Sequence, residues 1–133
     1  TQWMFSSESV TAGHPDKVCD AVSDAIVDAC LALDSNARVA VETCIKGMPD
    51  KSVIILAGEV SLEGETPDYA SIARKAAADI GYNSHDIGMD ATDESLCDVL
   101  VYVTTQSTFI NSFKFDFNIS FKNFCKLFDS YFF

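Results

Sequence analysis

A short stretch near the N-terminus, residues 6–17, gathers side chains suited to binding a metal-bound anion. Glu8, His14, Asp16 and Lys17 bring two carboxylates, an imidazole and an ammonium into ten residues. Pro15 suits the first turn of a helix, because its missing N–H would have no partner there. Free amides at a helix start bind anionic oxygens, and carboxylates bind divalent cations. The stretch therefore indicates a site for polyphosphate with magnesium, and the competing interpretation is an ordinary capped helix start with a solvated Lys17.

A helix must follow this stretch and position it. Apolar residues recur at helical spacing over 15–33, which predicts one buried stripe facing a sheet. The stripe consists of Val18, Val22, Ala25, Ile26, Ala29 and Leu33. Acidic residues recur every four positions on another side, at Asp16, Asp20, Asp24 and Asp28. We expect that side to be solvated, so that only Asp16, at the helix start, is placed to bind a ligand.

Two runs of alternating apolar residues, 38–46 and 53–62, predict a β-hairpin with its loop at 47–51. Each strand carries one carboxylate in its body, Glu42 in the first and Glu59 in the second. One interpretation places both on the solvated face of the sheet. The other places them in a cleft, where they hold cations that include a substrate ammonium group. The pattern alone leaves both open.

The remaining segments complete the predicted fold. Residues 2–5 suggest a short strand leading into the loop, and Thr66-Pro67 opens a second helix that Gly81 closes. The β-branched run 98–106 predicts a strand buried on both faces, with Gln106 at its end. The expected fold is α+β, a mixed or antiparallel sheet with two helices on one face.

Composition limits the class of protein. The chain of 133 residues has room for one domain with a modest core, and its net charge of −11 argues against a nucleic-acid or anionic-membrane partner. No apolar run reaches membrane-spanning length. Five cysteines, an odd number without CxxC spacing, indicate neither a zinc site nor a disulfide framework. We expect reduced, mostly buried thiols in a cytoplasmic protein.

The composition changes sharply near residue 108. Nine of the ten Phe residues lie in 109–133, and the net charge is −12 over 1–108 (6 Lys and Arg, 18 Asp and Glu) but +1 over 109–133 (three Lys, two Asp). We therefore divide the chain into a domain, 1–108, and a Phe/Asn/Lys-rich tail, 109–133. One interpretation of the tail is translated non-coding or frame-shifted sequence, because its abundant residues share A/T-rich codons. The other is a genuine tail that covers a surface of the domain.

Six motifs in order resemble the N-terminal domain of S-adenosylmethionine synthetase (methionine adenosyltransferase), over essentially all of 1–108. They are Ser7-Glu8-Ser9-Val10, Gly13-His14-Pro15-Asp16-Lys17, Ala37-Arg38-Val39-Ala40 with Glu42-Thr43, Ala57-Gly58-Glu59, Asp79-Ile80-Gly81-Tyr82 and Thr105-Gln106-Ser107. In that family the sulfur of methionine attacks C5′ of ATP and expels tripolyphosphate, which is hydrolysed to diphosphate and phosphate. The reaction uses Mg²⁺ and K⁺.

The resemblance implies roles for seven residues. His14 contacts the phosphates of ATP, and Lys17 adds positive charge beside them. Glu8 and Asp16 hold Mg²⁺, Glu42 lies at the K⁺ site, Glu59 binds the ammonium of L-methionine, and Gln106 binds methionine at the start of a mobile loop. The family also implies a homodimer or larger homo-oligomer, with active sites shared between subunits.

The resemblance stops after Ser107, where the family continues Pro-Asp-Ile and then supplies two further domains. We therefore expect this chain to be catalytically impaired alone. A second hypothesis is a non-catalytic interaction module that pairs with a full-length subunit. A third is an unrelated acidic nucleotide- and metal-binding domain.

Overall fold

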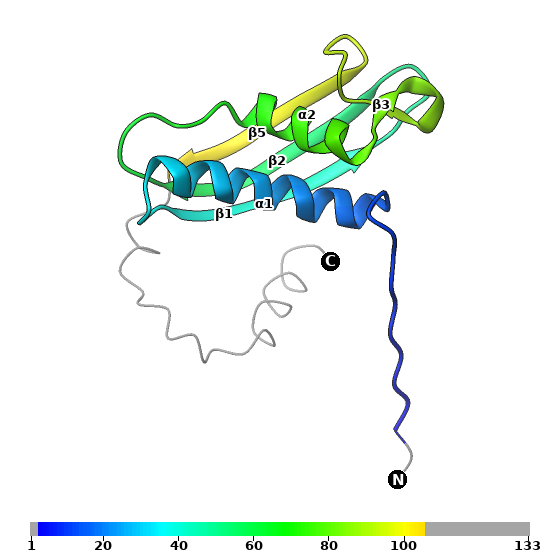
Figure 1. Ribbon diagram of the computed structural model, residues 1–133, viewed down its shortest axis with the longest axis horizontal. Coiled ribbons are helices and arrows are strands. Elements are labelled where there is room, and N and C mark those ends of the chain that lie inside the picture. The colour runs from blue at the N-terminus through cyan, green and yellow to red at the C-terminus, as the bar shows by residue number, and fades with distance from the viewer. Residues whose placement is uncertain (1–2, 106–133) are drawn as a thin grey trace, which may run out of the picture.

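The computed structural model describes residues 3–105 of the chain. A layer of two helices lies against a layer of strands (Figure 1). In chain order the elements are α1 (Pro15–Leu33), β1 (Arg38–Lys46), β2 (Ser52–Ser61), α2 (Tyr69–Ile80), β3 (Asn83–Ser84), the 3₁₀ turn η1 (His85–Ile87), β4 (Met89–Asp90) and β5 (Cys97–Thr105).

The main sheet is mixed and has the order β1-β2-β5. Strands β1 and β2 form the predicted antiparallel hairpin, in which Val41 pairs with Gly58. Strand β5 runs parallel to β2, and the chain between them passes through α2, because a parallel pair needs a crossover. Both helices cover the same face of the sheet (Figure 1). The predicted α+β class is therefore confirmed.

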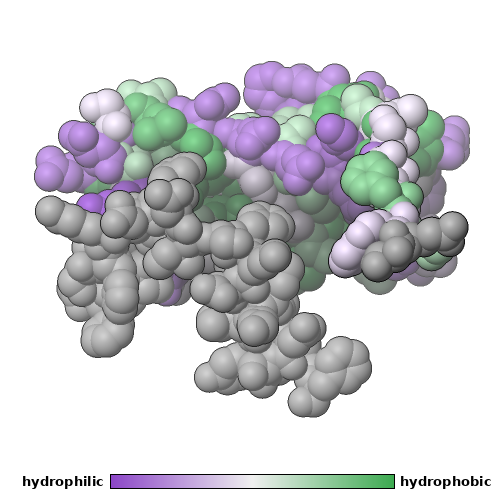
Figure 2. Space-filling model, turned by 90° about the horizontal axis from the view of Figure 1, so that it is seen from below, coloured by the Kyte–Doolittle hydropathy of each residue, from purple (hydrophilic) through white to green (hydrophobic). Residues whose placement is uncertain are grey.

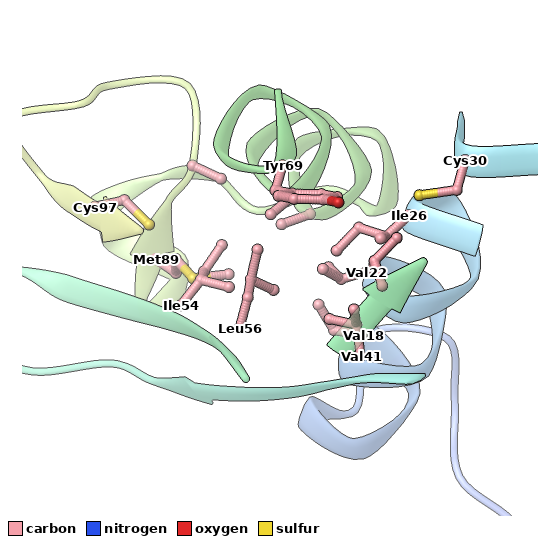
Figure 3. Packing of buried hydrophobic residues seen from close by; sticks show 14 residues of the cluster. Val18, Val22, Ile26, Cys30, Val41, Ile54, Leu56, Tyr69, Met89 and Cys97 are labelled. Atoms are coloured by element: carbon pink, nitrogen blue, oxygen red, sulfur yellow. The ribbon is translucent and has the colours of Figure 1, made fainter. Parts of the chain in front are cut away.

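The hydrophobic core lies between the two layers (Figure 3). Helix α1 buries every fourth residue, and β2 buries alternate residues on the helix side. The fully buried members include Val18, Val22, Ile26, Cys30, Ile54 and Leu56. The predicted stripe was wrong at its end, because Cys30 closes it and Leu33 is 58% exposed. Leu33 is the last residue of the helix, where the axis has passed beyond the core.

The hairpin residues alternate between two faces as predicted. Thr43 faces the helices, since its hydroxyl lies 2.8 Å from that of Ser23 on α1. Glu42, its neighbour, is exposed on the opposite face. Gly58 allows the two strands to pair closely: its φ is +152°, and a Cβ atom there would lie 1.9 Å from the carbonyl oxygen of Ala40.

The strand expected at residues 2–5 was wrong over its described part. Residues 3–11 have no regular secondary structure, and Trp3, Met4 and Phe5 are at least 90% exposed. A strand needs a neighbouring strand to pair with its backbone, and no described residue supplies one here.

Strand β5 is not buried on both faces, contrary to prediction. Among residues 3–105 it is an edge strand of a sheet whose helices lie on one side, and Leu100, Val101 and Tyr102 are 40%, 41% and 62% exposed. Periodicity could not show this, because a continuous apolar run fits a central strand and an edge strand equally well.

The second helix starts two residues later than predicted. Asp68, not Thr66, is the N-cap, and its carboxylate accepts a bond from the N–H of Ser71 at 3.1 Å. As predicted, the helix ends at Gly81, which has a φ of +127°.

Among the described cysteines Cys30 and Cys97 are buried, Cys19 is half-buried and Cys44 is exposed, so the expectation of mostly buried thiols fails at Cys44.

The side of the molecule seen in Figure 2 carries hydrophilic side chains next to hydrophobic ones. Asp16, Asp20, Asp24 and Asp28 are all exposed, so the solvated acidic side of α1 is confirmed. Within residues 3–105, neither helix has the length and apolar character needed to cross a membrane.

Candidate functional site

The start of α1 is a closed turn that holds His14 at the N-cap. The N–H of His14 donates to the carbonyl of Thr11 at 3.0 Å, and its own carbonyl accepts the first helical bond, from Val18, at 3.0 Å. Pro15 follows in the first turn. The predicted loop-to-helix transition is therefore confirmed, and His14 lies at it.

The imidazole of His14 caps the helix. Its Nδ1 accepts the backbone N–H of Asp16 at 3.2 Å. An accepting Nδ1 carries no proton, so the proton of the neutral ring resides on Nε2. The His14 side chain is 38% exposed, so solvent reaches the ring. The cap thus prepares the imidazole as a hydrogen-bond donor.

Tyr82 fixes the loop in front of the helix. Its hydroxyl donates to the carbonyl of Gly13 at 2.6 Å, across 69 residues of sequence. Sequence reasoning placed Tyr82 in a motif but assigned it no function. A glycine-tyrosine pair after a helix is a weak signal by itself, and only the tertiary contact shows that it anchors the loop.

A hollow of about 400 Å³ lies beside the helix start, between Pro15, Tyr82, Met89 and the end of β1. Lys46, at that end of β1, also lines it. The hairpin loop and the η1 turn approach closely here, because a Cβ on Gly47 would lie 2.6 Å from the carbonyl oxygen of Gly88. No motif or spacing in the sequence singles out Lys46.

The carboxylates of the helix start remain exposed. Glu8, Asp16 and Lys17 all lie on the surface, with the Asp16 side chain 88% exposed. No group of three metal-ligating side chains forms among residues 3–105. The donor chemistry suits Mg²⁺, which commonly takes one or two carboxylates and completes its shell with phosphate and water oxygens. Glu8 and Asp16 fit that partial role and do not form a complete site.

The two hairpin carboxylates lie on the face of the sheet opposite the helices. Glu59 pairs with Ala40, and Glu42 pairs with Ala57, so the two glutamates are diagonal neighbours on one face. Such neighbours are about 7–8 Å apart. Glu42 is exposed and Glu59 is half-buried. The structure brings this pair together on an open surface and does not enclose it.

The predicted site residues therefore fall into two groups. Glu8, His14, Asp16 and Lys17 lie before or in the first turn of α1, whereas Glu42 and Glu59 lie on the far face of the sheet (Figure 1). The sheet separates the pair from α1. Gln106 lies outside the described residues.

Several carboxylates with a lowered pKa serve the fold. Two backbone N–H groups, of Glu63 and Asn36, hold the pKa of Asp34 below its usual value. The backbone and hydroxyl bonds from Ser71 lower the pKa of Asp68, the cap of α2. These groups support turns and helix ends and lie apart from the helix start.

Fold and site together define a two-layer α+β domain with a capped, anion-suited helix start on one side of its sheet and paired carboxylates on the other. Comparison with known protein families matches residues 2–108 to the S-adenosylmethionine synthetase N-terminal domain. The match covers most of the 133 residues, and the chain belongs to this family.

Proposed function

We propose that this chain supplies the phosphate-binding wall of a methionine adenosyltransferase site and has little activity alone. The observation that carries the proposal is the helix start, where Nδ1 of His14 accepts the N–H of Asp16 in a chain of this family, which supports a role for Nε2 as a donor to phosphate. ATP and L-methionine are the proposed substrates, Mg²⁺ and K⁺ the proposed cofactors, and the cytoplasm the proposed location.

The proposed reaction needs hydrogen-bond donors and cations at the phosphates and does not need a strong base. When methionine sulfur attacks C5′ of ATP, a C–S bond forms and the C5′–O bond breaks, and tripolyphosphate leaves with the electron pair. Negative charge therefore grows on the phosphate oxygens, and fixed donors stabilise it. His14 donates from Nε2, Lys17 contributes charge, and Glu8 and Asp16 would hold Mg²⁺, which neutralises the phosphates when bound.

Glu42 and Glu59 serve the other half of the reaction in this proposal. Glu42 would hold K⁺, Glu59 would hold the ammonium of methionine, and Gln106 would hold the amino acid. Because the sheet separates this pair from His14 in one copy, a complete site needs residues from a second copy or from further domains. That separation supports the expected impairment.

Binding of Mg²⁺-tripolyphosphate to the full chain tests the phosphate wall. We expect measurable binding by calorimetry that falls at least about tenfold in His14→Asn, since a lost hydrogen bond to a charged group costs about 1.5–3 kcal/mol. Asparagine is a good N-cap, so this variant keeps the helix start while removing the Nε2 donor. Lys51→Gln is the control, because Lys51 pairs with Asp98 at 2.7 Å on another part of the molecule.

Unchanged binding in His14→Asn would contradict the assigned role.

Turnover is tested by incubating the chain with ATP, methionine, Mg²⁺ and K⁺ and measuring S-adenosylmethionine. Robust turnover by the chain alone would refute the proposed impairment.

The interaction-module hypothesis uses the segment 109–133 as the interface, and its support is that nine of the ten Phe residues lie in this segment. It predicts that the chain copurifies with a full-length subunit and that deletion of 109–133 abolishes copurification. Copurification that survives the deletion would place the contact on the domain itself.

A further inference from the structure

The face of the main sheet opposite the helices has no covering element among residues 3–105 (Figure 1). We call it the open face. Strand pairing places these residues on it: Ala40, Glu42 and Cys44 of β1, Ile55, Ala57 and Glu59 of β2, and Leu100 and Tyr102 of β5. The core cluster of the described residues lies on the other side of the sheet.

Apolar groups are contiguous on the open face. Ile55 pairs with Cys44 on one side and Leu100 on the other, and Ala57 pairs with Tyr102. Leu100 is 40% exposed and Tyr102 is 62% exposed. Neighbouring pairs of this kind form one patch, and an uncovered apolar patch on a sheet usually marks an interaction surface.

The rest of the chain begins at the edge of this face. Strand β5 ends at Thr105, and 28 residues follow it. Strands lie about 4.8 Å apart and an extended residue spans about 3.3–3.6 Å, so a few residues suffice to cross all three strands. The segment 109–133 is therefore long enough to extend across all three strands of the open face.

Composition and charge match the segment to the open face. Phe113, Phe115, Phe117, Ile119 and Phe121 alternate with the polar residues Lys114, Asp116, Asn118 and Ser120. Such alternation gives one aromatic and one polar side in an extended chain. The segment carries a net charge of +1, whereas residues 1–108 carry −12 and the open face includes Glu42 and Glu59.

We propose that the segment 109–133 covers the open face of its own chain, with its aromatic side against Leu100 and Tyr102. The covering depends on the residues of the segment and not on how that sequence arose. It does not rest on the proposed function. Covering the open face also removes Glu42 and Glu59 from solvent, which adds a physical cause of impairment.

Cys44 is a native probe of this face, because it is exposed on the described domain and pairs with Ile55 beside Leu100. The test measures alkylation of Cys44 by N-ethylmaleimide in the full chain, with peptides quantified by mass spectrometry. Asn83→Cys provides a reference thiol at an exposed site in the separate β3–β4 sheet. We expect Cys44 to react at least about fivefold more slowly than the reference thiol, because it reacts only when the segment opens.

Two triple variants test whether the aromatic side chains of the segment, rather than its presence alone, protect Cys44 from alkylation. Phe113→Ser with Phe115→Ser and Phe117→Ser should raise the Cys44 rate to that of the reference thiol. Lys114→Ser with Asp116→Ser and Asn118→Ser leaves net charge unchanged and should leave Cys44 protected. Since neither set touches the described core, circular dichroism should show the domain folded in both.

Protection by a second copy would weaken on about tenfold dilution, whereas protection by the chain's own segment is independent of concentration. Reaction of Cys44 in the unaltered chain at the rate of the reference thiol would overturn the proposal, and so would dilution-sensitive protection. Binding of Mg²⁺-tripolyphosphate at the helix start is measured separately, so its failure leaves this result intact.

Discussion

The two faces of one three-stranded sheet differ in what they do. The face under α1 and α2 holds the buried cluster, including Leu56, which is completely buried. The open face carries Glu42, Glu59 and exposed apolar groups such as Leu100, which is 40% exposed. Neighbouring residues of the same strand therefore belong to different environments. The buried core lies on one face, and Glu42 and Glu59, the predicted K⁺ and methionine contacts, lie on the other.

The same division separates the two groups of proposed site residues. His14 depends on the helix layer for its position, through the cap and through the Tyr82 contact to Gly13. Glu42 depends only on strand register. A domain built this way presents one set of ligands on each side of its sheet, which explains why a single copy does not enclose a site.

The largest contrast between the faces should come from a matched pair of leucines. Leu56→Ala removes a buried side chain and should lower the free energy of unfolding by about 2–5 kcal/mol. Leu100→Ala should cost about 1–2 kcal/mol in the full chain, where the segment 109–133 is proposed to cover Leu100, and less than about 1 kcal/mol in a chain that lacks 109–133. Urea denaturation of both variants measures the difference. A cost for Leu100→Ala below about 1 kcal/mol in the full chain would contradict the proposed covering by 109–133, and a cost equal to that of Leu56→Ala would remove the contrast between the two faces.

Gly58 tests how closely the hairpin is packed. Gly58→Ala should cost about 2–4 kcal/mol, because the new Cβ meets the backbone of Ala40 and φ is +152°. Gly64→Ala is the control: its φ is +99° but no atom lies within 4 Å of the new Cβ, so about 1 kcal/mol is expected. Equal costs in the denaturation experiment would mean that backbone strain alone matters and that β1 and β2 can separate locally.

Adjacent residues of β1 provide a smaller contrast across the sheet. Thr43→Val removes the partner of the Ser23 hydroxyl and should cost about 1 kcal/mol. Glu42→Gln, on the exposed side, should change the free energy of unfolding by less than about 0.5 kcal/mol. Thermal melts compare the two variants with the unaltered chain. A larger cost for Glu42→Gln than for Thr43→Val would reverse the assignment of faces.

The smallest effect concerns acid stability at the junction between α1 and the chain after β2. Asp34 has a lowered folded pKa, since it accepts bonds from the N–H groups of Glu63 and Asn36. The stabilisation of the folded state by ionised Asp34 is complete above the unfolded pKa of about 3.9. It is lost as the pH falls through the lower folded pKa. On acidification from neutral pH, the free energy of unfolding should therefore decrease less in Asp34→Asn than in the unaltered chain. Urea unfolding midpoints at each pH measure this decrease. Asp24→Asn, on the solvated side of α1, is the control, and equal acid slopes in all three chains would exclude this contribution.

Local pattern predicted most of the fold. The bounds of α1 and β1, and those of β2 to within one residue, followed from apolar periodicity, because a helix and a half-buried strand impose spacings that residues such as Val18 and Val41 reveal. The same periodicity failed at β5, since exposure of Leu100 and Tyr102 depends on what lies beside the strand. It also failed at residues 3–5, which have apolar character without a partner among the described residues.

For the site, the sequence by itself determined the donor types, the helix start and the family. Pro15, His14 and Asp16 specify a capped helix through bonds within a few residues, so no distant contact is needed. Only the tertiary structure decided that Tyr82 anchors this loop, that Lys46 lines the hollow beside it, and that Glu42 and Glu59 lie beyond the sheet. Those relations depend on strand order and on layer packing, which bring together residues that local spacing cannot relate.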